Sequence, residues 1–245
     1  MSAVNLYFDK LTEIMAEVVS TQSEAMDSAA EAVAKALESG NRIHAFGTGH
    51  SHILAEEIFY RAGGLVNINP ILDPPLMLHE SASKSTELER ELGYGQRLFD
   101  SYSLKSGDVL FVFSNSGRNG VSIDLAEIAR SNGLTVIVIT NMRHTMSGAS
   151  RHPSGKRLYE MGDIVIDNCG CIGDAAVEFD GGRIKTSPTS TAVGAAILNA
   201  IEAGAVENML ADGFEPELFC SSNVDGGDEI NAAFIEKYRG EIKAL

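Results

Sequence analysis

The sequence predicts an α/β fold, in which a doubly wound parallel sheet of five strands carries helices on both faces. Short apolar runs alternate along the chain with longer stretches that have apolar residues at helical spacing. This order is typical of parallel strands joined by right-handed helical crossovers. The run Val109–Phe113 is apolar at every position, as expected for a strand buried on both faces. A helical stripe formed by Val121, Leu125 and Ile128 follows it, so a short polar turn joins strand and helix.

The same two periodicities place the remaining elements. We expect strands near residues 42–46, 65–71, 109–113, 134–139 and 164–167, and helices near 52–62, 85–102, 120–132, 190–210 and 229–238. Residues 2–39 predict an N-terminal helical arm, which Gln22 and Ser23 can bend into two helices and which Gly40 ends. The segment Val177–Lys185, with Gly181 and Gly182 at its centre, predicts a small hairpin at the edge of the sheet.

Composition and charge narrow the range of partners. The chain has 245 residues, 44% of them hydrophobic, and a formal net charge of −15. Such a surplus of negative charge argues against nucleic acid and anionic membranes as partners. There is no apolar run of ~18 residues and no basic region ahead of an apolar one at the amino terminus. We therefore expect no transmembrane helix, no signal peptide and a cytoplasmic protein.

The cysteines indicate neither a disulfide framework nor a metal centre. Cys169, Cys171 and Cys220 are odd in number, and without an export signal we expect reduced thiols. The Cys169-Gly-Cys171 pair lacks the further ligands of a four-ligand site, and no pair of histidines has helical spacing. We expect no metal and no other cofactor.

Two polar turns that follow predicted strands are suited to bind a phosphate. The first, Gly47–His52, has glycines that let the backbone approach a ligand, and Ser51 offers a hydroxyl. The second, Ser114–Asn119, lies between a buried strand and a helix. Free N–H groups, hydroxyl donors and the positive end of the helix dipole together favour a phosphate there. Since Ser and Asn are also ordinary helix caps, a purely structural turn is the alternative.

A long loop after the fourth strand is unusually basic for so acidic a chain. Residues 141–158 contain no Asp or Glu; their basic residues are Arg143, His144, Arg151, His152, Lys156 and Arg157. The loop leaves the carboxyl end of a strand, where ligands of open α/β sheets bind. Three roles are open: attraction of an anionic ligand, docking on an acidic neighbouring subunit, and a solvated loop without a ligand.

These motifs resemble those of the sugar isomerase (SIS) domain family. The resemblance rests on Phe46-Gly-Thr-Gly-His-Ser51 and on Phe113-Ser-Asn-Ser-Gly-Arg-Asn119, and it covers roughly residues 40–210. Asn119 stands where the family usually has Thr, but Asn can also cap a helix and bind an oxygen. The long N-terminal helix and the tail near residues 222–228 are similar to a phosphoheptose-isomerase-like branch of bacterial SIS proteins.

The resemblance implies a flavodoxin-like sheet (the SIS fold), phosphosugar binding, and a homodimer or homotetramer. It implies a division into the helical arm, residues 1–39, and an SIS phosphosugar-binding domain, residues 40–245. It assigns the phosphate to Ser51, Ser114, Ser116 and Asn119, with Asn115 and Gly117 shaping the second turn. The other expected substrate-binding residues are Gly47, Thr48, Gly49 and His50. The segment Thr186–Thr191 resembles the Ser/Thr-rich helix start that flanks the sugar in several SIS enzymes.

Three residues are candidates for the proton transfer that sugar isomerisation requires. Moving a proton between adjacent carbons through an enediol needs a carboxylate or His as base and an acid at the sugar oxygen. Glu80 is the first candidate, because SIS isomerases and related etherases carry a Glu at a similar position, and His79 beside it can shuttle a proton. Ala55-Glu56-Glu57 resembles the Ala-Glu-Glu of phosphoheptose isomerases, which adds Glu57; a solvated helix position is its alternative.

Three functions remain open from the sequence. The first is an aldose–ketose phosphosugar isomerase that works through a carboxylate base. The second is a lyase that removes an ether substituent from a phosphorylated amino sugar. The third is a phosphosugar sensor without catalysis; a sensor usually has an output domain, and this sequence shows no basic helix-turn-helix segment. We expect the isomerase.

Overall fold

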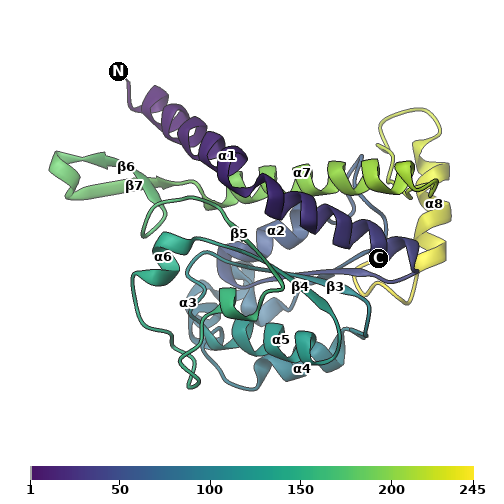
Figure 1. Cartoon of the computed structure of the whole chain (residues 1–245), viewed down its shortest axis with the longest axis horizontal. Coiled ribbons are helices and arrows are strands. Elements are labelled where there is room, and N and C mark those ends of the chain that lie inside the picture. Colours follow the sequence, from purple (N-terminus) through teal and green to yellow (C-terminus); the bar gives the residue numbers. More distant parts are fainter. Residues whose placement is uncertain (1) are drawn as a thin grey trace.

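The computed structural model describes residues 2–245 and contains the predicted sheet of five parallel strands (Figure 1). The strands are β1 (Ile43–Gly47), β2 (Ile68–Ile71), β3 (Val109–Ser114), β4 (Thr135–Thr140) and β5 (Ile164–Asp167), in the order β2-β1-β3-β4-β5. This order is flavodoxin-like, and the direction in which strands are added reverses between β1 and β3. The predicted α/β fold is confirmed, and it defines a switch point at which ligands of such sheets bind.

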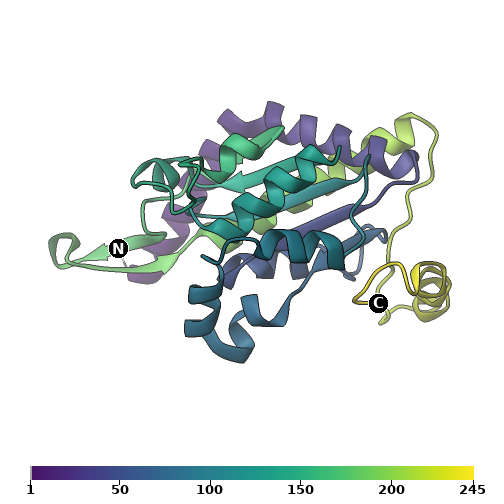
Figure 2. The same ribbon diagram turned by 90° about the horizontal axis from the view of Figure 1, so that it is seen from below.

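Helices cover both faces of the sheet (Figures 1 and 2). One face packs against α1 (Ala3–Glu38), α2 (His52–Glu57) and α7 (Ser190–Ala211), and the other against α4 (Tyr94–Ser101) and α5 (Gly120–Ser131). Alternate side chains of each strand supply the two cores: Phe111 and Phe113 belong to the first, Leu110 and Val112 to the second. Every residue of β3 is buried, which confirms the prediction for this strand.

The N-terminal arm is one continuous helix, so the bend considered at Gln22 and Ser23 is absent. The Ser23 hydroxyl donates to the Val19 carbonyl within the helix. The Gln22 side-chain oxygen accepts the backbone N–H of Asp167 at 3.0 Å and so anchors α1 to β5. From Leu11 onward α1 packs in or against the first core, while its first turns extend beyond the sheet (Figure 1).

The segment between β1 and β3 differs most from the expectation. Helix α2 ends at Glu57 instead of near residue 62. Residues 73–83 lie outside the expected strands and helices, and a single helix is expected at 85–102. The structure has there a 3-10 turn, η2 (Pro74–Leu76), then α3 (Leu78–Leu88) and α4. Gly93 separates the two helices with a φ of 76°, a conformation that L side chains rarely adopt. His79 and Glu80 lie in one helical turn at the start of α3, and the extended backbone of Ser81 (φ −162°, ψ 109°) separates this turn from the rest of the helix.

The predicted hairpin is present, but it forms a sheet of its own instead of joining the edge of the main one. Strands β6 (Ala175–Phe179) and β7 (Ile184–Pro188) pair antiparallel around a 3-10 turn, η4 (Asp180–Gly182). The hairpin projects beside the amino half of α1 (Figure 1), and the Tyr7 hydroxyl donates to the Pro188 carbonyl at 3.1 Å.

The remaining elements lie at the two ends of the sheet. The basic loop after β4 contains α6 (Met142–Met146) and a 3-10 turn, η3 (Leu158–Met161). The last helix, α8 (Gly227–Tyr238), joins a small cluster with Val66 and Phe219. Within residues 2–245, no helix combines the length and the apolar character needed to cross a bilayer.

Candidate functional site

A cavity of about 130 Å³ lies at the carboxyl ends of β1 and β3, at the switch point of the sheet. Both predicted turns contribute to its walls, together with the segment that leads into α7. Its lining residues are His50, Ser51, Leu54, Phe113, Ser114, Asn115, Ile139, Asn168, Asp174, Ser190 and Thr191. Apolar side chains with a few convergent hydroxyl and amide groups are typical of sites for small polar ligands.

The first turn folds so tightly that it requires glycine. A Cβ at Gly47 would lie 2.5 Å from the carbonyl carbon of Ser51, so no side chain fits there. Gly49 has a φ of 55°, and residues Gly49–Ser51 form a 3-10 turn, η1. This geometry brings His50 and Ser51 to the cavity wall, while Gly47, Thr48 and Gly49 do not line it.

The second turn is held in shape by hydrogen bonds from its own and neighbouring residues. The Ser114 hydroxyl oxygen accepts the backbone N–H of Gly117 at 3.1 Å. The Thr140 hydroxyl donates to the Ser114 carbonyl at 2.7 Å. Gly117 has a φ of 57°, and a Cβ there would lie 2.7 Å from the Thr145 hydroxyl. Ser114 keeps its own O–H free to donate to a ligand.

Only part of the second turn faces the cavity. Ser114 and Asn115 line it, whereas Ser116, Gly117 and Asn119 do not. Asn119 precedes α5 as its N-cap, but its side-chain oxygen accepts a hydrogen bond from Arg151 instead of from the helix. The structure thus brings four of the ten expected substrate-binding residues, His50, Ser51, Ser114 and Asn115, into one cavity.

Two polar residues of the cavity, Asn168 and Asp174, were not anticipated from the sequence. Asn168 follows β5 and is 4% exposed. Its side-chain amide donates to the Asn115 side-chain oxygen at 2.9 Å, and its own oxygen accepts the backbone N–H of Gly170 at 3.0 Å. No local pattern indicates this contact, because the two asparagines meet only through the pairing of strands.

Asp174 stands at the amino end of α7, where the Ser/Thr-rich segment had suggested a ligand. One carboxylate oxygen accepts the backbone N–H groups of Thr189 and Ser190 at 3.1 and 2.9 Å, and the other accepts the Ser190 hydroxyl at 2.5 Å. A carboxylate in this position complements the positive end of the helix dipole. The start of α7 thus already holds an internal anion beside the cavity.

The three predicted catalytic residues lie outside the cavity lining. His79 and Glu80 are exposed on the first turn of α3, which packs against Gly49–Ser51. Glu57, at the end of α2, forms an ion pair with Arg61 and accepts a hydrogen bond from Asn199 at 3.3 Å. Glu57 therefore faces α7 rather than the cavity.

A fourth carboxylate, Glu89, reaches the first turn and was not considered from the sequence. Its Oε2 accepts the hydroxyl proton of Thr48, which is 8% exposed, at 2.9 Å. Its backbone carbonyl accepts the N–H of Val121 in the first turn of α5 at 3.2 Å. Glu89 thus lies between the two turns, at the end of α3 instead of at its start.

The cavity relies on neutral donors. Among the described residues, neither Lys nor Arg lines it. His144, close to this region, has a pKa lowered from 6.5 by burial and by the positive charge of Arg118, while Asp174 opposes the shift. Burial likewise raises the pKa of the thiols of Cys169 and Cys171, which favours their protonated forms. Residues 2–245 contain no group of three or more His, Cys, Asp or Glu that could hold a metal ion.

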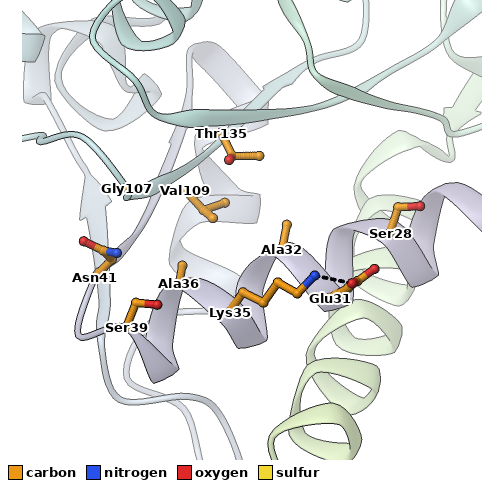
Figure 3. A pocket seen from close by; sticks show the side chains of 10 residues that line it. All are labelled: Ser28, Glu31, Ala32, Lys35, Ala36, Ser39, Asn41, Gly107, Val109 and Thr135. Carbon is orange, nitrogen blue, oxygen red and sulfur yellow. Dashed lines mark hydrogen bonds and ion pairs between the residues drawn. The ribbon is translucent and has the colours of Figure 1, made fainter.

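A larger groove at the opposite end of the sheet has fewer side chains free to bind a ligand. A groove of about 400 Å³ runs between the carboxyl half of α1 and the amino ends of β3 and β4 (Figure 3). Its two charged side chains, Glu31 and Lys35, form an ion pair with each other. The remaining lining is small or neutral, and it lies away from the carboxyl ends of the strands.

Comparison with known proteins identifies the family. Residues 6–141, which include both turns and strands β1 to β4, match the SIS domain. The chain belongs to the SIS domain family. A UPF0309 protein of Listeria innocua is 47% identical over 242 residues, covering 99% of this chain and 98% of the relative. A UPF0309 protein of Halalkalibacterium halodurans is 44% identical over 242 residues, covering 99% and 97%.

Solved structures share the fold of this SIS protein at low sequence identity. A phosphoheptose isomerase from Francisella tularensis superposes with a TM-score of 0.54 at 19% identity, covering 84% of this chain and 100% of that one. The NanR protein of Vibrio vulnificus, complexed with ManNAc-6P, gives a TM-score of 0.53 at 16% identity and covers 98% and 70%. These likenesses establish the SIS fold.

Proposed function

We propose that this SIS protein binds a phosphosugar in the switch-point cavity and interconverts its aldose and ketose forms. The observation that carries the proposal is the meeting of Ser51 with Ser114 and Asn115 in one cavity beyond the ends of β1 and β3. Two structures of the same fold are named for related ligands, one as a phosphoheptose isomerase and one as a complex with ManNAc-6P.

The phosphate is held by hydrogen bonds to neutral groups. The chain carries a net charge of −15, which repels an anion at long range. Hydroxyl and amide donors at close range compensate, since hydrogen bonds to a charged acceptor are roughly twice as strong as neutral ones. Ser51 and Ser114 supply hydroxyls in the cavity, and the half-exposed Ser116 supplies one on the same turn as Ser114 but outside the lining.

The proton transfer requires a carboxylate beyond the phosphate. Glu80 remains the first candidate for the base, with His79 beside it as the proton shuttle, because both lie at the start of α3, which packs against the first turn. Glu57 is the second candidate. Glu89 is a third, since it already contacts Thr48 of that turn. A base of this kind accounts for a rate factor of ~10²–10⁴.

One observation favours a sensor as the second candidate function. The cavity has a single carboxylate in its lining, Asp174, and that group is engaged by three donors at the start of α7. Glu80 is exposed and Glu57 is paired with Arg61. A protein that only binds the phosphosugar needs no free base in the cavity.

We also infer a homo-oligomer, a dimer or tetramer, in which the helical arm takes part. Large apolar side chains are exposed on the amino half of α1 and on the hairpin beside it: Val4 is 66% and Phe8 60% exposed, Phe179 42% and Ile184 46%. Apolar side chains gathered on projecting elements are typical of association sites. Residues 40–245 then constitute the phosphosugar-binding domain.

The experiment is solvent deuterium exchange into sugar phosphates that bind. Ligands are first selected by thermal stabilisation, since a ligand at 100 times its dissociation constant adds about 2.7 kcal/mol. We expect the wild type to incorporate deuterium next to the carbonyl carbon, and Glu80→Gln to bind equally but exchange ~10²–10⁴-fold more slowly. Glu236→Gln, exposed on α8, serves as control.

Each outcome of the exchange experiment has one interpretation. If Glu80→Gln exchanges at the wild-type rate, Glu80 is not the base, and Glu57→Gln and Glu89→Gln decide between the remaining candidates. If a bound sugar phosphate loses an ether substituent instead of isomerising, the protein is a lyase. If the wild type binds sugar phosphates but exchanges with none, it is a sensor.

A further inference from the structure

Three arginines gather around one short segment of the loop between α6 and η3. The Arg118 Nε donates to the carbonyl of Ala149 at 2.7 Å. The Arg157 Nη2 donates to the carbonyl of Gly148, also at 2.7 Å. Arg151 contacts Arg118 through the backbone: its N–H donates to the Arg118 carbonyl at 2.9 Å. The guanidinium groups of Arg118 and Arg157 therefore contact the carbonyls of two adjacent residues, and Arg151 is attached to the backbone of Arg118.

No carboxylate neutralises this cluster. Within residues 2–245, every arginine except Arg90 and these three forms an ion pair with Asp or Glu at 4.0 Å or less. Arg151 donates instead to the side-chain oxygen of Asn119 at 3.0 Å. Glu160 accepts the backbone N–H of Arg157 and not its guanidinium. In a chain of net charge −15, uncompensated positive charge in one place is unexpected.

The other basic residues of the same loop do have acidic partners. His152 lies 2.9 Å from the Asp124 carboxylate and Lys156 lies 3.4 Å from that of Glu127, both on α5. Arg143 pairs with Glu17 of α1 at 2.5 Å. These contacts attach the loop to its neighbouring helices. The loop therefore contains two kinds of basic residue, those that hold it in place and those that lack a counter-charge.

The arrangement leaves guanidinium N–H groups without an acceptor, and these can donate to an anion. The Arg118 guanidinium lies directly over Gly148, where a Cβ would come within 2.9 Å of its Nη1. The Arg157 Nε is buried and has no hydrogen-bond partner within the described chain. Arg118 and Arg157 are half-buried, whereas Arg151 is exposed. Partly desolvated guanidiniums with N–H groups to spare bind phosphate and carboxylate strongly, because their planar donors match these anions.

The arginine cluster shares a turn with the switch-point cavity. Ser114 and Asn115 of this turn line the cavity, and Arg118 and Asn119, at its other end, belong to the cluster. The turn after β3 therefore connects the cavity lining to the cluster.

We propose that Arg118, Arg151 and Arg157 form a second anion site, which binds a phosphate or carboxylate group outside the cavity. The group belongs either to a separate small anion or to a second acidic substituent of the sugar ligand; the chemistry of recognition is the same. The site goes beyond the proposed function, since it stands whether or not the cavity catalyses a reaction.

The test is calorimetric titration of the full chain with inorganic phosphate at low ionic strength, with sodium chloride of equal ionic strength as reference. We expect Arg151→Gln combined with Arg157→Gln to weaken phosphate binding about 10-fold or more, as loss of charge-assisted hydrogen bonds does. Arg143→Gln, which removes a paired charge from the same loop, should change the affinity less than about two-fold. The single variant Arg151→Gln, at an exposed position, keeps the test valid if the double variant unfolds.

A second titration separates the two sources of the anion. If both anionic groups belong to one ligand, a hexose bisphosphate should bind the wild type about 10-fold or more tightly than the matching monophosphate does. In Arg151→Gln this difference in affinity should disappear. If the anion is a separate molecule, inorganic phosphate should bind with the same affinity in the presence and absence of saturating monophosphate.

The proposal is overturned if Arg143→Gln weakens phosphate binding as much as Arg151→Gln does. It is also overturned if phosphate does not bind and an acidic peptide does. The Ser51→Ala variant changes the cavity and leaves the arginine cluster intact. Its affinity for the monophosphate therefore tests the proposed function separately from the second anion site.

Discussion

The side-chain amide of Asn168 donates a hydrogen bond to the side-chain oxygen of Asn115, with 2.9 Å between Nδ2 and Oδ1. This contact links the end of β5 to the turn after β3 within the cavity. It leaves the Asn115 amide group free to donate to a ligand, because the oxygen of that side chain is already the acceptor. The last strand thus sets the orientation of a side chain on a central strand.

The first prediction follows from this contact. We expect Asn168→Ala to weaken phosphosugar binding by about 1 kcal/mol, since Asn115 loses the hydrogen bond that orients it. Asn168→Asp should weaken binding further, because a carboxylate repels the phosphate. The measurement is calorimetric titration with a sugar phosphate that stabilises the wild type. Asn132→Ala, exposed at the end of α5 with its amide donating to the Ile128 carbonyl, is the control. Unchanged affinity in Asn168→Asp would contradict the assignment.

The second prediction concerns the hydroxyl groups of the two turns. Ser51→Ala and Ser116→Ala should each weaken binding of a sugar phosphate by ~1–3 kcal/mol, the contribution of a hydrogen bond to a charged group. The thermal midpoint of unfolding should barely change, because neither hydroxyl holds the fold together. Ser131→Ala, whose hydroxyl only donates to the Glu127 carbonyl within α5, is the matched control. Equal affinities in all three variants would remove both serines from the phosphate site.

The third prediction is a pH dependence of stability that originates in a buried pair at the amino end of the sheet. His44 is fully buried, with its Nε2 3.0 Å from Asp108 and its Nδ1 3.3 Å from the Asn69 amide. Burial lowers the pKa of His44 below 6.5, although the neighbouring Asp108 opposes the shift. These partners match a neutral imidazole that donates from Nε2 and accepts at Nδ1.

The sign of this dependence follows from proton binding. In the unfolded chain His44 takes up a proton near pH 6.5, and in the folded protein it does so only at lower pH. The contribution of neutral His44 to stability is therefore complete above pH 6.5 and declines as the pH falls. Asp108 affects stability only at lower pH. Burial alone would raise its pKa, but hydrogen bonds from His44 and from the backbone hold the pKa below 3.8. We expect the free energy of unfolding, measured in urea from pH 7 to 5, to fall by at most about 1.4 kcal/mol per pH unit for the one proton of His44. His44→Gln should flatten this slope, whereas the exposed His79→Gln should keep it.

The fourth prediction tests the association surface on the arm. Phe8→Asp and Phe179→Asp place charges on two elements that project side by side, α1 and the hairpin (Figure 1). Burying a charge in an apolar interface is unfavourable, so both variants should sediment as smaller species than the wild type at micromolar concentration. Leu210→Asp, 54% exposed near the end of α7, should sediment as the wild type does. A wild type that is already monomeric would contradict the oligomer.

The local sequence pattern was sufficient to predict the sheet and the two turns. The apolar run Val109–Phe113 and its neighbours predicted buried parallel strands, because a strand covered on both faces needs apolar side chains at every position. The glycines and serines of the turns were recognised because turn geometry and helix capping depend on neighbouring residues. The polar segment around Glu80 lies outside the helices expected from the sequence. In the structure it forms one helical turn, and the rest of α3 follows after Ser81. Burial of Leu76 and the hydrogen bond from the Ser85 hydroxyl to the Leu76 carbonyl outweigh the weak local propensity.

The sequence by itself determined the fold class and the turns that face the switch point, because periodicity and turn chemistry act over a few residues. Only the tertiary structure decided which distant side chains meet. Asn168 and Asn115 are 53 positions apart, Asp174 and Ser190 are 16 apart, and Thr48 and Glu89 are 41 apart. The order of strands in the sheet brings such residues together, and that order arises from how the whole chain buries its apolar surface.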